Sequence, residues 1–146
     1  MIQLDLRSLA IDEISAQCTT EQKQQIQGNA CHELLRRALE ERSAEAWHAF
    51  EAQFGALMTF LAQQESLRYG FSSLDEEEIA DLRSDGLARF IDRYASRFSV
   101  NFEHIGAALS VLHKCIASSV QERYRNRQRA TKLNSALQQQ AISHER

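Results

Sequence analysis

The sequence predicts an all-α fold, and three observations favour it. The 146 residues contain no proline and only five glycines, so almost nothing interrupts a helix. Apolar residues recur three or four positions apart in several segments, a spacing that places side chains on one face of a helix. Ala, Leu, Gln, Glu and Arg, which favour helices, dominate the composition. The length in turn suits one domain with a sizeable core. We therefore expect a single all-helical domain.

The N-terminal residues 1–42 predict an arm followed by a helix. Residues 1–16 alternate apolar and polar positions too briefly for a sheet, so we expect a short extended or helical arm. Thr19 and Gln22 make a capping-box pattern, which predicts a helix that runs to about Arg42.

Two amphipathic helices are expected next, each preceded by a residue that can cap it. Ser43 precedes a helix that extends to about residue 64 and carries the most strongly amphipathic pattern in the chain. Its expected core residues are Trp47, Phe50, Phe54, Leu57, Met58 and Leu61. Asp75 precedes a helix that extends to about residue 95, with Glu78 at the capping-box position. Its expected core residues are Ile79, Leu82, Leu87, Phe90, Ile91 and Tyr94.

The last expected helix covers residues 102–130, begins apolar and ends basic, with Asn101 as its N-cap. Its apolar face comprises Ile105, Leu109, Leu112, Ile116, Val120 and Tyr124. Its basic run comprises Arg123, Arg125, Arg127, Arg129 and Lys132. Like charges four residues apart cost an isolated helix about 0.2–0.5 kcal/mol per pair. The run therefore indicates either a polyanionic partner or a solvated helix end, and residues 133–146 are expected to fray.

The distribution of charge indicates the class of partner, and the cysteine content indicates the cellular compartment. The net charge of −3 combines an acidic segment, 75–92, with a basic segment, 114–132, so the local patches indicate partners better than the sum does. The three cysteines form no CxxC motif, which supports neither a zinc ribbon nor a redox pair. No signal peptide or membrane-spanning run is evident. We expect a soluble, cytoplasmic protein with reduced cysteines.

The sequence contains no signature of an enzyme. It has no P-loop, GxSxG or HExxH motif. Glu45 and His48 form one Glu-x-x-His motif, but a di-iron helical bundle needs two. His32 and His48 are expected at or near the surface, and Cys115 in the core. We therefore predict no catalytic residue, no metal site and no cofactor.

Three segments together resemble the region 2 domain of bacterial sigma factors, especially those of the extracytoplasmic-function group. Residues 81–91, DLRSDGLARFI, resemble the DLVQEVFLRLW stretch of that family. Residues 46–61 resemble its AFxxLYxxYxxxLxxxA helix, and residues 109–129 resemble its WLxxIARNxxxDxxRRxxR helix. The resemblance covers about residues 33–130. It implies a compact helical bundle over residues 43–132, preceded here by an extra N-terminal helical arm.

The resemblance also implies a function in transcription initiation. In that family, the acidic-capped helix docks on the clamp helices of the β′ subunit of core RNA polymerase, and the last helix holds the non-template strand of the promoter −10 element. The positions that would face polymerase are Asp81, Leu82, Asp85 and Arg89. The positions that would face DNA are Lys114, Arg123, Tyr124, Arg125, Arg127 and Arg129.

This chain departs from the family pattern in its last helix. Ala108 stands at the family's Trp position and Cys115 at its Asn position, which leaves Tyr124 as the only Phe, Trp or Tyr residue within 109–129. Aromatic platforms contribute about 1–3 kcal/mol for each captured base, so promoter melting by this chain alone is not expected. A second protein that supplies the function of region 4, or an anti-sigma factor, is an expected partner. The alternative is a helical adaptor or sigma mimic that binds proteins and no DNA.

Overall fold

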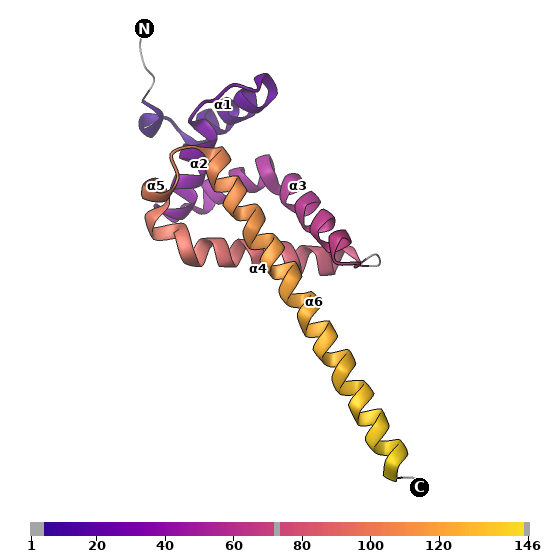
Figure 1. The fold of residues 1–146 in the computed structure, drawn as a ribbon. Coiled ribbons are helices and arrows are strands. Elements are labelled where there is room, and N and C mark those ends of the chain that lie inside the picture. The colour runs from indigo at the N-terminus through magenta and orange to yellow at the C-terminus, as the bar shows by residue number, and fades with distance from the viewer. Residues whose placement is uncertain (1–4, 72–73, 145–146) are drawn as a thin grey trace.

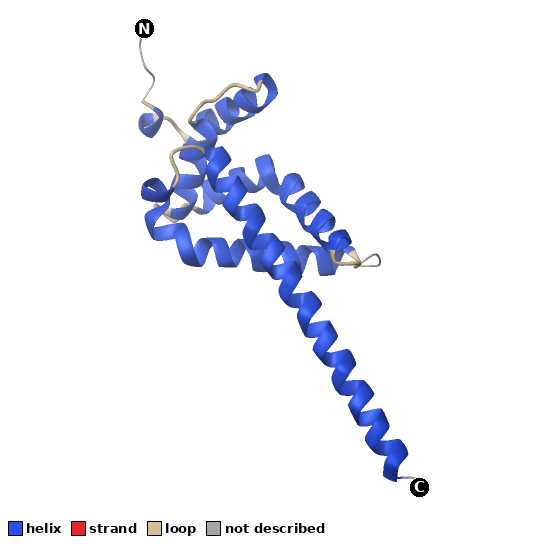
Figure 2. Ribbon diagram, viewed as in Figure 1, coloured by secondary structure: helices blue, strands red, loops and turns tan. Residues whose placement is uncertain are grey.

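The fold is all-α, as the composition predicts, and the computed structural model describes it for residues 5–71 and 74–144 (Figures 1 and 2). Over those residues the chain forms helices, turns and loops but no strand. The elements are η1 (Leu6–Ser8), α1 (Ile11–Gln24), α2 (Ala30–Leu39), α3 (Ala44–Arg68), α4 (Glu76–Tyr94), η2 (Ala95–Arg97), α5 (Phe98–Asn101) and α6 (Ile105–His144).

One apolar core joins the five long helices. Phe50 of α3 and Phe90 of α4 are fully buried, and Phe102 stacks on Phe90 with a centroid distance of 5.8 Å. Ile14 of α1 and Leu34 of α2 are buried in the same cluster. The N-terminal helices therefore pack into the domain and do not form an arm outside it.

The predicted helix from Thr19 to Arg42 is wrong, because the chain turns after α1. Gln25 adopts a left-handed conformation with a φ of 53°, which ends the first helix. Thr19 lies inside α1, where its hydroxyl donates to the Ser15 carbonyl at 3.1 Å and caps nothing. A glutamine in this conformation is uncommon, so Gln25 does not mark where the helix ends; the local signal for a break is Gly28 and Asn29 in the loop that follows.

A disulfide and a carboxylate cap join α1 to α2. Cys18 and Cys31 are bonded to each other, and both side chains are buried. The expectation of reduced cysteines is therefore corrected, because the packing of two helices, rather than a spacing motif, brings these residues together. Glu21 of α1 accepts the Ala30 amide at 3.1 Å and so caps α2, where the side chain of Asn29 makes no capping bond.

Helix α3 begins at the predicted cap, because the Ser43 hydroxyl accepts the Ala46 amide at 3.1 Å. The helix ends at Arg68, a full turn beyond the predicted end. Most of its predicted core stripe is buried or half-buried, but Leu57 is exposed. The buried members are Phe50, Phe54 and Met58.

Helix α4 also begins where the sequence predicts and packs closely on α6. The Asp75 carboxylate accepts the Glu78 amide at 2.8 Å. A Cβ atom added at Gly86 would lie 2.7 Å from the Cα atom of Ile116 in α6. Glycine is therefore the residue that lets these two helices approach so closely.

The predicted cap of the last helix is wrong. Asn101 is the final residue of α5, and α6 begins only at Ile105. His104 takes the capping role instead, because its Nδ1 atom accepts the Ala107 amide at 3.1 Å. The predicted apolar face of α6 does turn inward. Its fully buried members are Leu112, Ile116 and Val120.

Helix α6 continues to His144, where the sequence analysis expects a frayed tail. Its 40 residues correspond to a length of about 60 Å. Figure 1 shows it crossing the bundle and projecting beyond the other helices. Residues 131–143, which we call the α6 overhang, are exposed throughout, and Leu133 and Leu137 are 61% and 54% exposed.

Candidate nucleic-acid interface

The two predicted site surfaces meet in one groove between α4 and α6. The groove has a volume of about 530 Å³. Its lining includes Asp85 and Arg89 from the predicted polymerase-facing set, and Arg123 and Arg127 from the predicted DNA-facing set. The sequence does not reveal this juxtaposition, because it arises from the close packing of α4 on α6.

Ion pairs and burial distinguish the members of the polymerase-facing set. Arg89 donates to Asp85 at 3.1 Å and also pairs with Glu122 of α6. Asp81 is exposed, and no described residue forms an ion pair with it. Leu82 is only 2% exposed, so its side chain serves the core and is not available to a partner.

Glu78 forms ion pairs with two arginines of the DNA-facing set. Its carboxylate lies 2.8 Å from Arg127 and 3.9 Å from Arg123. Both pairs connect the first turn of α4 to α6. These two arginines therefore fasten the long helix to the bundle, which makes them less available to phosphate groups. The capping-box pattern around Asp75 does not predict these ion pairs of Glu78 with α6.

The remaining basic residues form a separate surface on the outer side of α6. Lys114, Arg125 and Arg129 are exposed, as is Lys132, which continues the run. At 100° per residue these four positions fall within about 60° of one another around the helix. None of them forms an ion pair with a described residue. We call these four residues the basic stripe.

Tyr124 is not an isolated aromatic residue in the structure. Its ring centroid lies 5.4 Å from that of Tyr69 and 6.0 Å from that of Phe71. Both partners come from the connection between α3 and α4, outside the predicted helices. Two aromatic residues on either side of Gly70 were the available signal.

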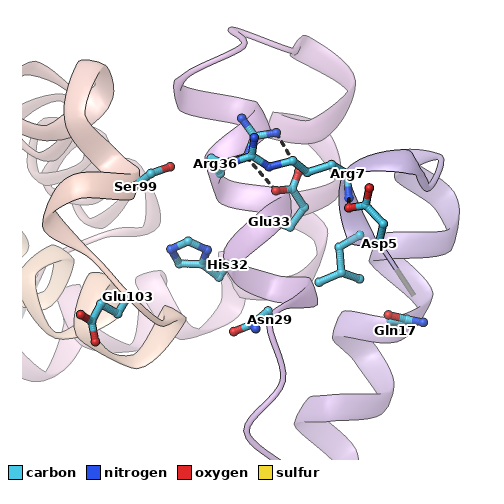
Figure 3. Close-up of a pocket in the computed structure, with 10 residues that line it drawn as sticks. Asp5, Arg7, Gln17, Asn29, His32, Glu33, Arg36, Ser99 and Glu103 are labelled. Carbon is cyan, nitrogen blue, oxygen red and sulfur yellow. Dashed lines mark hydrogen bonds and ion pairs between the residues drawn. The ribbon is translucent and has the colours of Figure 1, made fainter. Parts of the chain in front are cut away.

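A second cavity, of about 790 Å³, lies between the N-terminal segment, α2 and the connection that leads to α6 (Figure 3). The Glu33 carboxylate at its base accepts hydrogen bonds from Arg36 at 2.7 Å and from Arg37 at 2.9 Å. Burial raises the pKa of Glu33, but these bonds and the two positive charges outweigh it, so the pKa lies below its ordinary value. The same pairing raises the pKa of Arg36.

This charged cluster holds the N-terminal segment in place. Arg37 also donates to the carbonyl oxygens of Leu6 and Arg7, at 2.9 and 3.0 Å. The Nε2 atom of His32 lies 2.7 Å from the Phe102 carbonyl oxygen. The charges of Glu33, Arg36 and Arg37 are therefore satisfied by one another at this cavity (Figure 3).

Neither a metal centre nor a membrane span emerges from the described part of the chain. No group of three His, Cys, Asp or Glu residues could hold a metal ion there. No helix there is long and apolar enough to cross a bilayer. No protein-family model, curated protein or solved structure matches this chain.

Proposed function

We propose that this chain is a sigma-like transcription factor that binds core RNA polymerase through α4 and the promoter non-template strand through α6. The segregation of charge on two neighbouring helices carries the proposal. Helix α4 exposes carboxylates, whereas the outer side of α6 bears the basic stripe, whose four side chains pair with no described residue. Two oppositely charged faces on one rigid unit suit a protein that contacts a protein and a polyanion at the same time.

The geometry of the basic stripe suits an extended DNA strand. Lys114 and Lys132 are separated by about 27 Å along the helix axis, at 1.5 Å per residue. Arginine binds phosphate through two parallel hydrogen bonds and stacks on bases, so Arg125 and Arg129 serve both requirements. The pairing of Glu78 with Arg123 and Arg127 holds α6 firmly on α4, which presents the stripe on a fixed support.

The polymerase-facing assignment rests on Asp81 and Asp85. Asp81 has no ion-pair partner among the described residues, and Asp85 shares Arg89 with Glu122. Exposed charges of this kind accelerate association with a complementary surface and select the partner. The resemblance of residues 81–91 to the polymerase-docking stretch of sigma factors supports the choice of partner.

Replacing Arg125 and Arg129 with glutamine tests the DNA-binding half of the proposal. For single-stranded DNA, log K falls with log salt by about 0.7 for each phosphate contact, so losing two contacts should flatten the slope by about 1.4. Binding should weaken with little dependence on sequence. Titration of a labelled single-stranded oligonucleotide at several salt concentrations measures both quantities.

The matched control replaces Arg93 and Arg97 with glutamine. Both are exposed, Arg93 in the last turn of α4 and Arg97 in η2. This control removes the same charge from the chain, so an equal loss of slope would show an effect of net charge alone. Absence of DNA binding by the unaltered protein at low salt would contradict the proposal.

A helical protein-interaction module is the second candidate function, and the α6 overhang favours it. Leu133 and Leu137 lie one helical turn apart and are more than half exposed. An amphipathic helix with exposed leucines suits a groove or a helix of another protein. This candidate predicts negligible binding of DNA in the titration above, even at low salt.

A further inference from the structure

The exposed side of α3 carries apolar side chains and no charge. From Ala52 to Gln64 the helix contains no charged residue, whereas charged residues make up 25% of the whole chain. A surface helix normally turns charged and polar residues toward solvent. Figure 1 shows the C-terminal half of α3 extending away from α1 and α2. Seven residues of this side are exposed, and we call them the α3 outer face: Ala52, Ala56, Leu57, Phe60, Gln63, Gln64 and Leu67.

The composition of the α3 outer face is that of a protein–protein interface. At 100° per residue its seven members fall within about 140° around the helix. Leu57, Phe60 and Leu67 are 39%, 51% and 65% exposed. The centres of interfaces are rich in aromatic and apolar side chains and depleted of charge. The apolar pattern that predicts Leu57 in the core is therefore accounted for by a partner that covers this side of the helix.

An apolar cavity of about 420 Å³ lies beside the α3 outer face. Its lining includes Phe54, which precedes Leu57 by one turn of α3, and Leu109 of α6. Ile26, from the connection between α1 and α2, also lines it and is 54% exposed. A pocket next to an apolar face suits an anchoring side chain of a partner.

We propose that the α3 outer face binds the same face of a second copy of this chain, with the two α3 helices antiparallel. A twofold interface brings one patch against itself, so any charge on the patch would meet its like. A face without charge avoids this repulsion. Antiparallel pairing about position 62 sets Leu57 of one copy against Leu67 of the other, and Phe60 against Gln64. Leu67 then reaches the side of α3 that holds the apolar cavity.

The absence of charge on the α3 outer face argues against other classes of partner. Its seven side chains offer no cation to a phosphate and no carboxylate to a basic protein. The exposed carboxylates of α4 and the basic stripe of α6 belong to other helices and take no part in this contact. The inference therefore goes beyond the proposed function and does not rest on it.

The size of the face determines the strength of the dimer. Ala52 and Leu67 are separated by about 22 Å along the helix axis. A contact of this length and one helix wide buries less than the roughly 800 Å² per partner of a standard stable interface. The association is therefore reversible, and the fraction of dimer depends on the protein concentration.

Sedimentation equilibrium of the unaltered protein tests the inference, at concentrations from about 1 μM to about 1 mM that span weak association. The average mass should rise with concentration from 16.7 kDa toward twice that value. A constant monomer mass over the whole range would overturn the dimer. The DNA titration described above is independent of this result, so the proposed function would still stand.

The variant Phe60→Gln with Leu67→Gln should weaken dimerisation by at least about thirtyfold, the effect of losing one hot-spot residue. The matched control is Leu133→Gln with Leu137→Gln, which removes two exposed apolar side chains from the α6 overhang. The control should dimerise as the unaltered protein does. A dimer that the control loses and the α3 variant keeps would place the interface on the overhang and overturn the inference.

Charge exchange at Gln64 separates the loss of the interface from a loss of fold, because this side chain is exposed. In the antiparallel pairing the two copies of Gln64 lie about 6 Å apart along the helix axis. Gln64→Lys alone and Gln64→Glu alone should each dimerise less than the unaltered protein, because like charges meet. An equal mixture of the two variants should recover the association. Failure of the mixture to associate better than either variant alone would contradict the pairing of this face with itself.

Discussion

Glu33 illustrates how one buried carboxylate fixes the position of the N-terminal segment. Its carboxylate accepts hydrogen bonds from Arg36 and Arg37, and Arg37 also donates to the Leu6 carbonyl in η1. Burial raises the pKa of Glu40, but hydrogen bonds from Ser99 and Arg36 lower it by a larger amount. This second carboxylate therefore also has a pKa below its ordinary value. Both carboxylates are therefore more stable in the charged form when the protein is folded.

The lowered pKa of Glu33 predicts that the protein loses stability in acid. A carboxylate with a lowered folded pKa contributes stability above its ordinary pKa of 4.5, and this contribution is lost as the pH falls from there through the folded value. Glu33→Gln should lower the unfolding free energy at neutral pH by about 1–3 kcal/mol and make it less sensitive to acid. Urea unfolding at several pH values measures both changes.

Glu13→Gln is the control for this prediction, because Glu13 is exposed and pairs with no described residue. Its unfolding free energy should change by no more than about 1 kcal/mol, the contribution of an exposed carboxylate in the first turn of a helix. If Glu33→Gln retained the full loss of stability in acid, the carboxylate cluster would not be its source.

At the scale of single elements, the contact between α4 and α6 depends on Gly86. The same glycine lies in the segment that resembles sigma factors, but its role emerges only from the position of Ile116. A Cβ atom there meets backbone, which cannot move aside as a flexible side chain can.

Gly86→Ala should destabilise the protein by about 1–3 kcal/mol, because the two helices must separate. This range is the net loss, after the gain of about 1 kcal/mol that alanine brings to a helix interior. Gly55→Ala in α3 is the matched control, since its nearest neighbours are the side-chain ends of Glu51 and Arg83 at 3.3 and 3.4 Å. That variant should be as stable as the unaltered protein or more stable. Equal denaturation midpoints for the two variants would contradict this account.

Element boundaries were predictable where the signal is local. Ser43 and Asp75 cap their helices as the sequence predicts, because each needs only the backbone amide three residues ahead. The break after α1 was not predictable in this way, since Gln25 carries no preference for its left-handed conformation. The cap on α2 comes from Glu21, which belongs to another helix.

The candidate site was predictable in outline only. The arginine run, the acidic helix and the division of the run between two sides of the last helix are visible in the sequence, but the partner of one side is not. Arg123 and Arg127 face Glu78, whereas Arg125 and Arg129 face outward, because residues two positions apart lie on opposite sides of a helix. The aromatic partners of Tyr124 come from a connection that has no periodic pattern.

At the scale of the whole molecule, the proposed function predicts a direct complex with core RNA polymerase. Asp81→Lys reverses an exposed charge that has no ion-pair partner among the described residues, so the fold should remain intact. Association with core polymerase should weaken by about twofold to tenfold at low salt, and less at high salt. Binding to immobilised core polymerase at two salt concentrations, with circular dichroism of the variant, measures this.

Asp12→Lys, an equal charge reversal at an exposed position of α1, is the control and should leave the affinity unchanged. Unchanged binding by Asp81→Lys would remove this face of α4 from the polymerase interface. Absence of any complex with the unaltered protein would favour the protein-interaction module.

The bond between Cys18 and Cys31 gives the N-terminal helices a stability that depends on the redox potential of the surroundings. Closing a loop of this length restricts the unfolded chain and contributes about 3 kcal/mol in the chain-entropy description. Exchange of this disulfide with a third cysteine requires that cysteine to attack as a thiolate. Burial raises the pKa of Cys115, so the third sulfur supplies little thiolate at neutral pH. The raised pKa therefore slows exchange of the disulfide with Cys115 in the folded protein, and a reductant from outside has to reach the junction of α1 and α2.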